Sequence, residues 1–374
     1  MKFTCDRNAL TEAINISQKA VAVRSTLPVL EGLLIKAKDG KVVITGNDLE
    51  IGIECFLEAE VESEGSIVVN SRLFGDIIRK MTGDSVVIDV NSNNVTNIKC
   101  GNSKFNITGI ESAEFPEIQR FDVEYDITIS QKQLKELVRQ TIFAVGTNES
   151  KMILTGCLLE ASGKEVNMVA VDGFRLAYKK ITCENEIVSG FLGDVSIVIP
   201  SKSLNELIKI SDDSDDDIKI YCSEKNIRFE FNNVIFTSRL LEGDYIDYKK
   251  IIPLDYKTTI KSDVRPLIEA VERASLIITS EVTKAPVIMN IVDAEIKINC
   301  ETQIGKVEEY IPVDMIGDSI EIGFNNKYLL DALKAVSTDE IKFSFIGPTS
   351  PCLISPVEGD DFKYIVLPVR LKTE

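Results

Sequence analysis

The residue that most often performs acid–base chemistry in proteins is missing from this sequence. The chain of 374 residues contains no histidine. It therefore lacks the commonest general acid and base, and any Ser-His or Cys-His nucleophile pair. Neither G-x-x-x-x-G-K-[ST] nor G-x-G-x-x-G occurs, so no standard phosphate-binding loop is visible. The sequence therefore gives little support to an enzyme. The alternative that remains open is a metal-dependent nuclease or nucleotidyl transferase.

Carboxylates are the residues that could hold a metal. The acidic run at residues 212–217 lacks the glycine and the terminal glutamate of an EF-hand loop, so we interpret it as a solvated loop. Asp48, Glu50 and Asp172 could serve as nuclease carboxylates, but they fall far apart in the repeat scheme described below. We therefore expect no metal and no cofactor.

The eight cysteines are scattered and form no C-x-x-C pair, which disfavours structural zinc. We predict buried free thiols at Cys5, Cys55, Cys100, Cys157, Cys183, Cys222, Cys300 and Cys352. No apolar run approaches the ~18 residues that a membrane span needs, and the first residues do not form a signal peptide. The expected location is the cytoplasm, with no membrane partner.

A short alternating strand followed by a capped amphipathic helix occurs six times. The predicted N-caps are 59 to 71 residues apart, a period that marks a repeated unit: Asp6, Ser71, Ser130, Ser201, Ser262 and Asn325. One repeat cannot bury its helix face alone, so we pair the repeats into three domains, 1–124, 125–253 and 254–374. The expected fold class is α+β, with two helices on antiparallel sheets in each domain.

Charge is distributed unevenly between the predicted helices and the rest of the chain. The formal charge is −17, from 42 basic and 59 acidic residues, which by itself argues against nucleic acid. The six helices, however, hold 15 of the basic and only 9 of the acidic residues. These helices either have merely solvated basic faces or form one surface that faces an anionic rod, with an acidic exterior elsewhere.

Two motifs carry the strongest signal. Residues 171–177, V-D-G-F-R-L-A, place an Asp-Gly turn between two strand-like runs. About 65 residues later residues 238–248 read S-R-L-L-E-G-D-Y-I-D-Y. With the N-terminal M-K-F-T, T-L-P-V-L at 26–30, D-L-E at 48–50, I-G-F-N at 322–325 and the ending Y-I-V-L-P-V-R-L at 364–371, the whole chain resembles the bacterial DNA polymerase III beta subunit, the sliding clamp.

The resemblance implies a ring-shaped, head-to-tail homodimer that encircles double-stranded DNA and performs no chemistry of its own. Twelve helices of ~10 Å width leave a hole of ~28 Å, which admits a duplex of ~20 Å, whereas six leave only ~9 Å. Implied partners are DNA polymerases and the clamp-loader ATPase, bound through short peptide motifs. A protein scaffold that does not bind DNA is the further alternative.

The resemblance also supplies candidate contacts. Arg24 and Asn148 are similar in position to DNA-contacting residues of the family, while helix position alone adds Arg72, Arg79, Lys135 and Lys202. Leu276 and Ile277 match the apolar pair of the subunit interface, with Phe105 and Ile107 as their expected partners.

The resemblance implies that the family's peptide-binding cleft corresponds to three segments of this chain and to its C-terminal run. Arg175 is expected to point away from the core. Phe174, Val171 and Ile246 stand where relatives often have His or Tyr, Thr, and Pro, so this cleft is expected to be more apolar. Its expected ligand is a glutamine-led motif ending in Leu and Phe. The full set is Leu154, Val171, Gly173, Phe174, Arg175, Leu176, Ile246, Lys250, Ile251, Asn325, Tyr328, Val366, Leu367, Pro368, Val369, Arg370 and Leu371.

Overall fold

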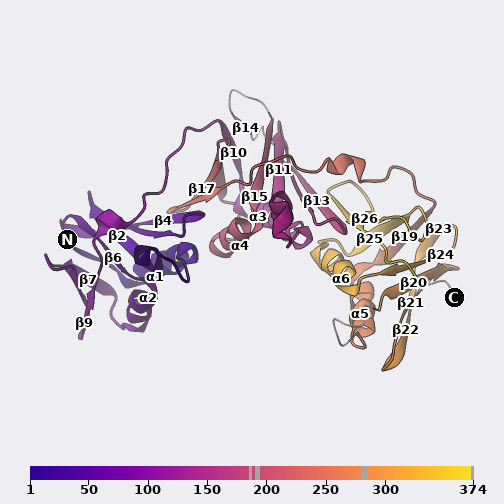
Figure 1. Cartoon of the computed structure of the whole chain (residues 1–374), viewed down its shortest axis with the longest axis horizontal. Coiled ribbons are helices and arrows are strands. Elements are labelled where there is room, and N and C mark those ends of the chain that lie inside the picture. Colours follow the sequence, from indigo (N-terminus) through magenta and orange to yellow (C-terminus); the bar gives the residue numbers. More distant parts are fainter. Residues whose placement is uncertain (185–187, 190–193, 279–284, 372–374) are drawn as a thin grey trace. The chain divides into compact units, whose positions relative to one another are not determined.

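The chain folds into two compact units in a computed structural model (Figure 1). The structure describes residues 1–184, 188–189, 194–278 and 285–371. The first unit comprises Met1–Lys132, Val188–Gly193 and Ser203–Leu240, and the second comprises Gln133–Ile187, Asp194–Lys202 and Leu241–Glu374. Both units draw on the predicted central region 125–253, because each contains a sheet whose strands are far apart in the sequence.

The first unit contains two antiparallel sheets. The five-stranded sheet has the order β5 (Glu60–Ser63), β1 (Lys2–Asp6), β7 (Ser85–Val90), β8 (Val95–Cys100), β9 (Ser103–Thr108). The nine-stranded sheet has the order β14 (Val188–Ser189), β10 (Tyr125–Ser130), β16 (Asp217–Cys222), β17 (Asn226–Phe231), β18 (Val234–Arg239), β4 (Ile51–Glu58), β3 (Lys41–Asn47), β2 (Gly32–Lys38), β6 (Gly65–Asn70). The pairing of β18 with β4 joins segments about 180 residues apart.

The second unit repeats this plan. Its nine-stranded sheet has the order β15 (Val195–Pro200), β11 (Gly156–Ser162), β12 (Glu165–Val171), β13 (Arg175–Thr182), β27 (Phe362–Val366), β26 (Cys352–Pro356), β25 (Glu340–Phe345), β19 (Thr258–Asp263), β23 (Asp314–Gly317). The four-stranded sheet has the order β22 (Gly305–Pro312), β21 (Glu295–Thr302), β20 (Val287–Val292), β24 (Ile320–Phe324). Here β13 pairs with β27, again over a long separation in sequence.

Six α-helices are present in the described part of the chain, as the repeat predicts. They are α1 (Arg7–Ser17), α2 (Ser71–Lys80), α3 (Gln131–Arg139), α4 (Ser201–Ile210), α5 (Val264–Ser275) and α6 (Asn326–Ala335). Helix α1 packs on β3 and β4 and against α2, and α5 packs on β21 and β22 and against α6. The predicted α+β class, with helices on antiparallel sheets, is confirmed.

Side-chain caps precede α1, α2 and α6, and three of the predicted caps, Ser71, Ser201 and Ser262, lie one residue away from the cap position. The Asp6 carboxylate accepts the Ala9 N–H at 2.8 Å, and the Asn325 amide oxygen accepts the Lys327 N–H at 2.9 Å, as predicted. Helix α2 is capped by Asn70, whose Oδ1 accepts the Leu73 N–H at 2.9 Å, so the prediction of Ser71 is wrong. Asp263, rather than Ser262, precedes α5. Asp263 has the extended backbone that a cap requires, but its side chain makes no capping hydrogen bond.

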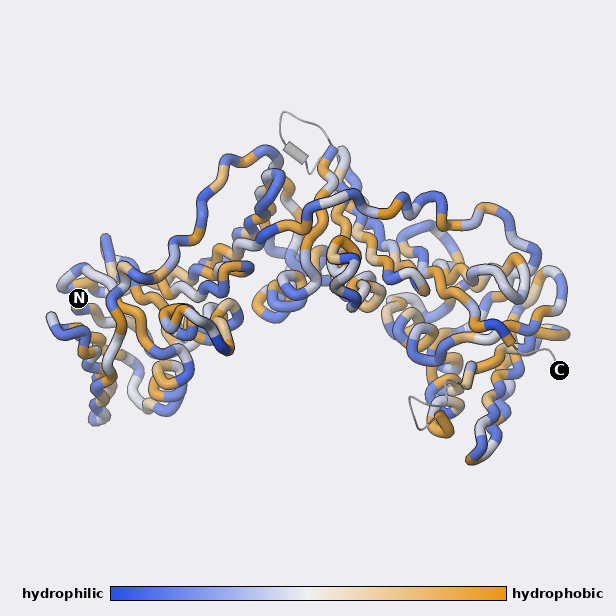
Figure 2. The backbone as a smooth tube through the Cα atoms, viewed as in Figure 1, coloured by the Kyte–Doolittle hydropathy of each residue, from blue (hydrophilic) through white to orange (hydrophobic). Residues whose placement is uncertain are grey.

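Buried apolar residues alternate along many strands and recur along the helices. Figure 2 colours the backbone by the hydropathy of each residue. All eight cysteines are free and seven are buried; only Cys183 is half-buried. The expectation of free thiols is confirmed. No helix in the described ranges is long and apolar enough to cross a membrane.

Candidate functional site

The Asp-Gly motif forms the predicted turn between β12 and β13, in the second unit. Val171 pairs with Leu176 across it. The Asp172 carboxylate accepts the backbone N–H groups of Phe174 at 2.9 Å and Arg175 at 3.0 Å. Gly173 has a φ of +92°, in the region that glycine adopts without strain. The turn therefore has a fixed shape, and it projects the Phe174 ring, 59% exposed, away from the sheet.

The expectation that Arg175 points away from the core is wrong. Its side chain is only 9% exposed and forms ion pairs with Asp172 at 2.9 Å and Asp331 at 2.5 Å. The guanidinium also lies 4.5 Å from the ring centroid of Tyr328 and 5.7 Å from that of Phe143. Two carboxylates and two aromatic rings offset the cost of removing this cation from water.

An apolar cluster lies under the turn. Its partly buried members include Ile153, Leu241, Tyr245 and Ile251, and its buried members are Leu158, Val169, Val171, Leu176, Val198, Tyr248, Leu353 and Ile365. Leu154 and Val366 are buried as well. Of the predicted cleft residues, Leu154, Val171, Leu176 and Val366 are buried, whereas the apolar side chains of Phe174, Ile246 and Val369 are exposed.

The segment 246–251 packs against this apolar cluster through Tyr248 and Ile251. The Tyr248 hydroxyl donates a hydrogen bond to Glu160 at 2.5 Å, and its ring stacks on that of Tyr178 at 5.9 Å. Burial raises the pKa of Tyr248 well above its usual value, and the Glu160 hydrogen bond adds to that shift. Lys250 is exposed and pairs with Asp247 at 2.8 Å. The segment is thus anchored by a neutral tyrosine and presents Lys250 to solvent.

The last described residues contribute the C-terminal part of the predicted cleft. After β27 the chain leaves the sheet, and the N–H of Leu367 donates to the Phe174 carbonyl at 2.9 Å. The N–H of Val369 donates to the Gly323 carbonyl at 2.8 Å. A Cβ on Gly323 would stand 2.7 Å from Leu371 Cδ2, so a larger residue there would require the Leu371 side chain to shift. The predicted strand at the start of this run is present as β27, and the groove-lining role of the residues after it stays a prediction.

Asn325 and Tyr328, two of the predicted cleft residues, lie at the start of helix α6. Asn325 serves as its N-cap, and the Tyr328 ring stacks on Phe174 with centroids 6.0 Å apart and an interplanar angle of 24°. The sequence did not identify Asp331 or Phe143 as site residues. Asp331 is 156 positions from Arg175, and no local pattern connects the two.

The predicted DNA contacts differ in accessibility. Arg24, Arg72 and Lys202 are exposed. Arg79 is engaged with Asn15 at 2.7 Å and Asp76 at 2.9 Å.

The exposed Asn148 caps a 3₁₀ segment, Glu149–Thr155, by accepting the Ser150 N–H at 2.9 Å. Lys135 is only 8% exposed, so the prediction that it is an accessible contact is wrong. It lies on the buried i, i+3, i+4, i+7 stripe of α3 formed by residues 131, 134, 135 and 138.

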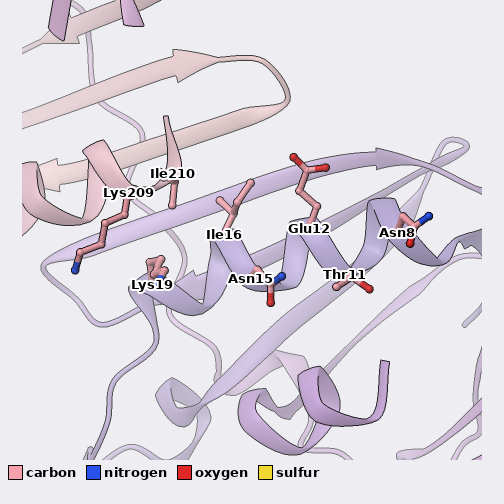
Figure 3. Close-up of a pocket in the computed structure, with 8 residues that line it drawn as sticks. All are labelled: Asn8, Thr11, Glu12, Asn15, Ile16, Lys19, Lys209 and Ile210. Carbon is pink, nitrogen blue, oxygen red and sulfur yellow. The ribbon is translucent and has the colours of Figure 1, made fainter. Parts of the chain in front are cut away.

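A polar cavity of about 400 Å³ opens between α1 and α4 in the first unit (Figure 3). Lys19 and Lys209 lie at one end of it. Lys209 pairs with Glu206 at 2.7 Å. Both lysines are cations that the sequence analysis did not select, and the complete lining is Asn8, Thr11, Glu12, Asn15, Ile16, Lys19, Lys209 and Ile210.

The four candidate interface residues also differ. Phe105 is exposed on β9, the last strand of the five-stranded sheet, but Ile107 is buried within its own unit. Leu276 follows α5 and is 75% exposed, and Ile277 is half-buried. Phe105 and Leu276 are therefore the accessible members of this set.

Within the described ranges no group of three or more Cys, Asp or Glu side chains is placed to hold a metal ion. In the acidic run, Asp212 accepts a hydrogen bond from Asn232 at 3.0 Å and Asp216 accepts one from Ser214 at 2.9 Å. These carboxylates are occupied by local hydrogen bonds.

Six strand-helix units on antiparallel sheets are the fold expected of a sliding clamp, and comparisons with known proteins show that class. Family models of the DNA polymerase III beta subunit match in order: the N-terminal domain at residues 1–119, the central domain at 128–247 and the C-terminal domain at 249–370. The beta sliding clamp of Bacillus subtilis is 37% identical over 381 residues, covering 99% of this chain and 100% of the relative.

Two solved structures are similar throughout. The Bacillus subtilis sliding clamp superimposes with a TM-score of 0.95 at 36% identity, covering 100% of both chains. A beta subunit from Eubacterium rectale gives 0.94 at 34% identity, covering 99% of this chain and 100% of the other. The chain belongs to the DNA polymerase III beta subunit family, the beta sliding clamps, so the predicted family and its non-catalytic role as a polymerase subunit are confirmed.

Proposed function

We propose that two copies of this chain close head to tail into a ring around duplex DNA and tether DNA polymerases to the template. The full-length, in-order match to sliding clamps carries this proposal. A ring holds its partner near the primer end by raising the effective concentration of the polymerase, so no reaction of its own is required. We place this activity in the cytoplasm, where the bacterial chromosome is replicated.

The DNA-facing surface is proposed to consist of helix residues together with two loop residues. Arg24, Arg72, Lys202 and Asn148 are the retained candidates because they are exposed. Arg79 is a weaker candidate, since Asp76 and Asn15 already satisfy its guanidinium. Few phosphate contacts suit a ring that must slide, and the acidic remainder of the chain would repel nucleic acid elsewhere.

Polymerases and a clamp-loader ATPase are proposed to bind the cleft of the second unit through short peptides. An apolar floor with a few polar groups at its edge is the usual form of such a site. The positive charges of Arg175 and Lys250 do not determine which peptides the cleft prefers, because both residues are paired with carboxylates. A peptide with Leu and Phe at its end, and without strong negative charge, fits this composition.

The subunit contact is proposed to involve the β9 edge of one copy and the end of α5 of the other. Phe105 and Leu276 are exposed apolar side chains at those places. Covering the free edge of β9 would also protect backbone groups that otherwise invite aggregation. The domain boundaries 124/125 and 253/254 belong to this proposal. The first falls between the matched family models at 1–119 and 128–247, whereas the third model begins at residue 249, a few residues before the second boundary.

Retention on DNA tests the proposal. Protein loaded onto a closed circle should persist in salt that strips electrostatic binders, and it should leave once the circle is cut. Phosphate contacts alone would give the same salt sensitivity on linear and circular DNA, and that result would refute a topological mode of binding.

A further inference from the structure

Arg175, the first residue of β13, lies where three segments of the second unit meet. Its Nε donates to Asp172 of the turn at 2.9 Å, and its Nη1 donates to Asp331 of α6 at 2.5 Å. Its guanidinium lies over the rings of Tyr328, from α6, and Phe143, from the 3₁₀ segment Ile142–Ala144. The positive charge of Arg175 is therefore compensated by Asp172 and Asp331 within the protein, and little of the guanidinium is exposed toward the cleft.

The same turn determines the aromatic wall of the cleft. Phe174, one residue before Arg175, stacks on Tyr328, the residue whose ring carries the guanidinium. The Phe174 carbonyl accepts the N–H of Leu367 at 2.9 Å, so the C-terminal segment is fixed to this turn as well. Moving the turn would shift both the Phe174 wall and the start of the C-terminal side.

We infer that Arg175 is a positioning residue of the partner cleft: it binds no group of the partner peptide but holds the Phe174 turn at a fixed distance from α6. The inference rests on the proposed function, because it concerns the site in which partner peptides are proposed to bind. Binding of a peptide then depends on Arg175 and Asp331 as one unit. A planar guanidinium that bridges two carboxylates has no equivalent in lysine, which is a single-point cation.

Calorimetry tests the positioning role of Arg175 by measuring the affinity of a synthetic peptide that begins with glutamine and ends in Leu and Phe. Arg175→Gln and Asp331→Ala should each weaken binding by about tenfold or more, and the double variant should be no weaker than Arg175→Gln. Arg175→Lys should behave like Arg175→Gln. A direct contact would instead leave affinity unchanged in Asp331→Ala, and the effects would add in the double variant; either outcome overturns the inference.

The matched control is Arg265→Gln, which removes an exposed ion pair of α5 with Glu269 at 3.0 Å and should leave peptide affinity unchanged. Melting temperatures of all variants show whether each one is folded. If Arg175→Gln does not fold, the peptide affinities of Arg175→Lys and Asp331→Ala are compared with that of the unmodified protein instead.

A second readout needs no ligand. The chain contains no tryptophan, so Phe174→Trp places a single fluorophore on the turn. Adding Arg175→Gln should increase acrylamide quenching of that tryptophan, because the turn is released from α6. Unchanged quenching overturns the positioning role. If the unmodified protein fails to bind the peptide, the proposed cleft function is wrong, and the quenching result still decides whether Arg175 fixes the turn.

Discussion

Leu276→Asp should weaken the subunit contact strongly. Leu276 is 75% exposed in the single chain, and full burial of a leucine contributes about 1.5–3 kcal/mol, so about 1–2 kcal/mol is available at each interface. A ring of two chains contains two identical interfaces, and the loss doubles to about 2–4 kcal/mol. The dissociation constant should therefore rise by about 30-fold to about 1,000-fold, and more if the carboxylate is desolvated.

Sedimentation velocity over a dilution series measures this shift, and light scattering should find monomers for the double change Leu276→Asp with Ile277→Asp. Phe105→Asp should produce a comparable shift from the other side of the contact. The control is Ile316→Asp on β23, since Ile316 is 79% exposed but lies outside the proposed contact. A Leu276→Asp protein that dimerises like the unmodified one would refute the placement of the interface.

Three further outcomes are expected. Removing residues 369–374, which takes away the Val369–Gly323 hydrogen bond, should abolish calorimetric binding of a polymerase-derived peptide and leave the dimer intact; unchanged affinity would exclude this cleft. Burial raises the pKa of four thiols to about 12, so a thiol reagent at mild pH should label at most Cys183 quickly, and rapid labelling that survives Cys183→Ser would contradict this. Hydrogen bonds from Lys297 and Lys306 lower the pKa of Glu308 from 4.5 to about 2, so its contribution to stability is present above pH 4.5 and is lost as the pH falls toward 2. The small melting-temperature gap between the unmodified protein and Glu308→Gln should close over that range, and a constant gap would show that the pairing does not stabilise the fold.

Local signals in the sequence were sufficient for the elements. The Asp-Gly pair predicts the turn because Asp172 can accept the N–H groups two and three residues ahead and Gly173 can adopt positive φ. Asp6 and Asn325 predict helix starts because their side chains reach the first free N–H groups. Six repeats of strand and helix then predict the α+β class, since each unit has an apolar face that needs a partner.

What the sequence determined by itself is therefore the set of elements, their repeat and, through the motifs, the family. Only the tertiary structure decided which charged residues are available. Lys135 and Arg175 look like surface cations in sequence, yet one lies on the buried stripe of α3 and the other between Asp172 and Asp331. The pairing of β13 with β27 and of β18 with β4 was likewise invisible, because strand partners far apart in sequence leave no local periodicity. The physical reason is the same in each case: propensity and capping act within a few residues, whereas burial and charge compensation depend on segments that meet only in the folded chain.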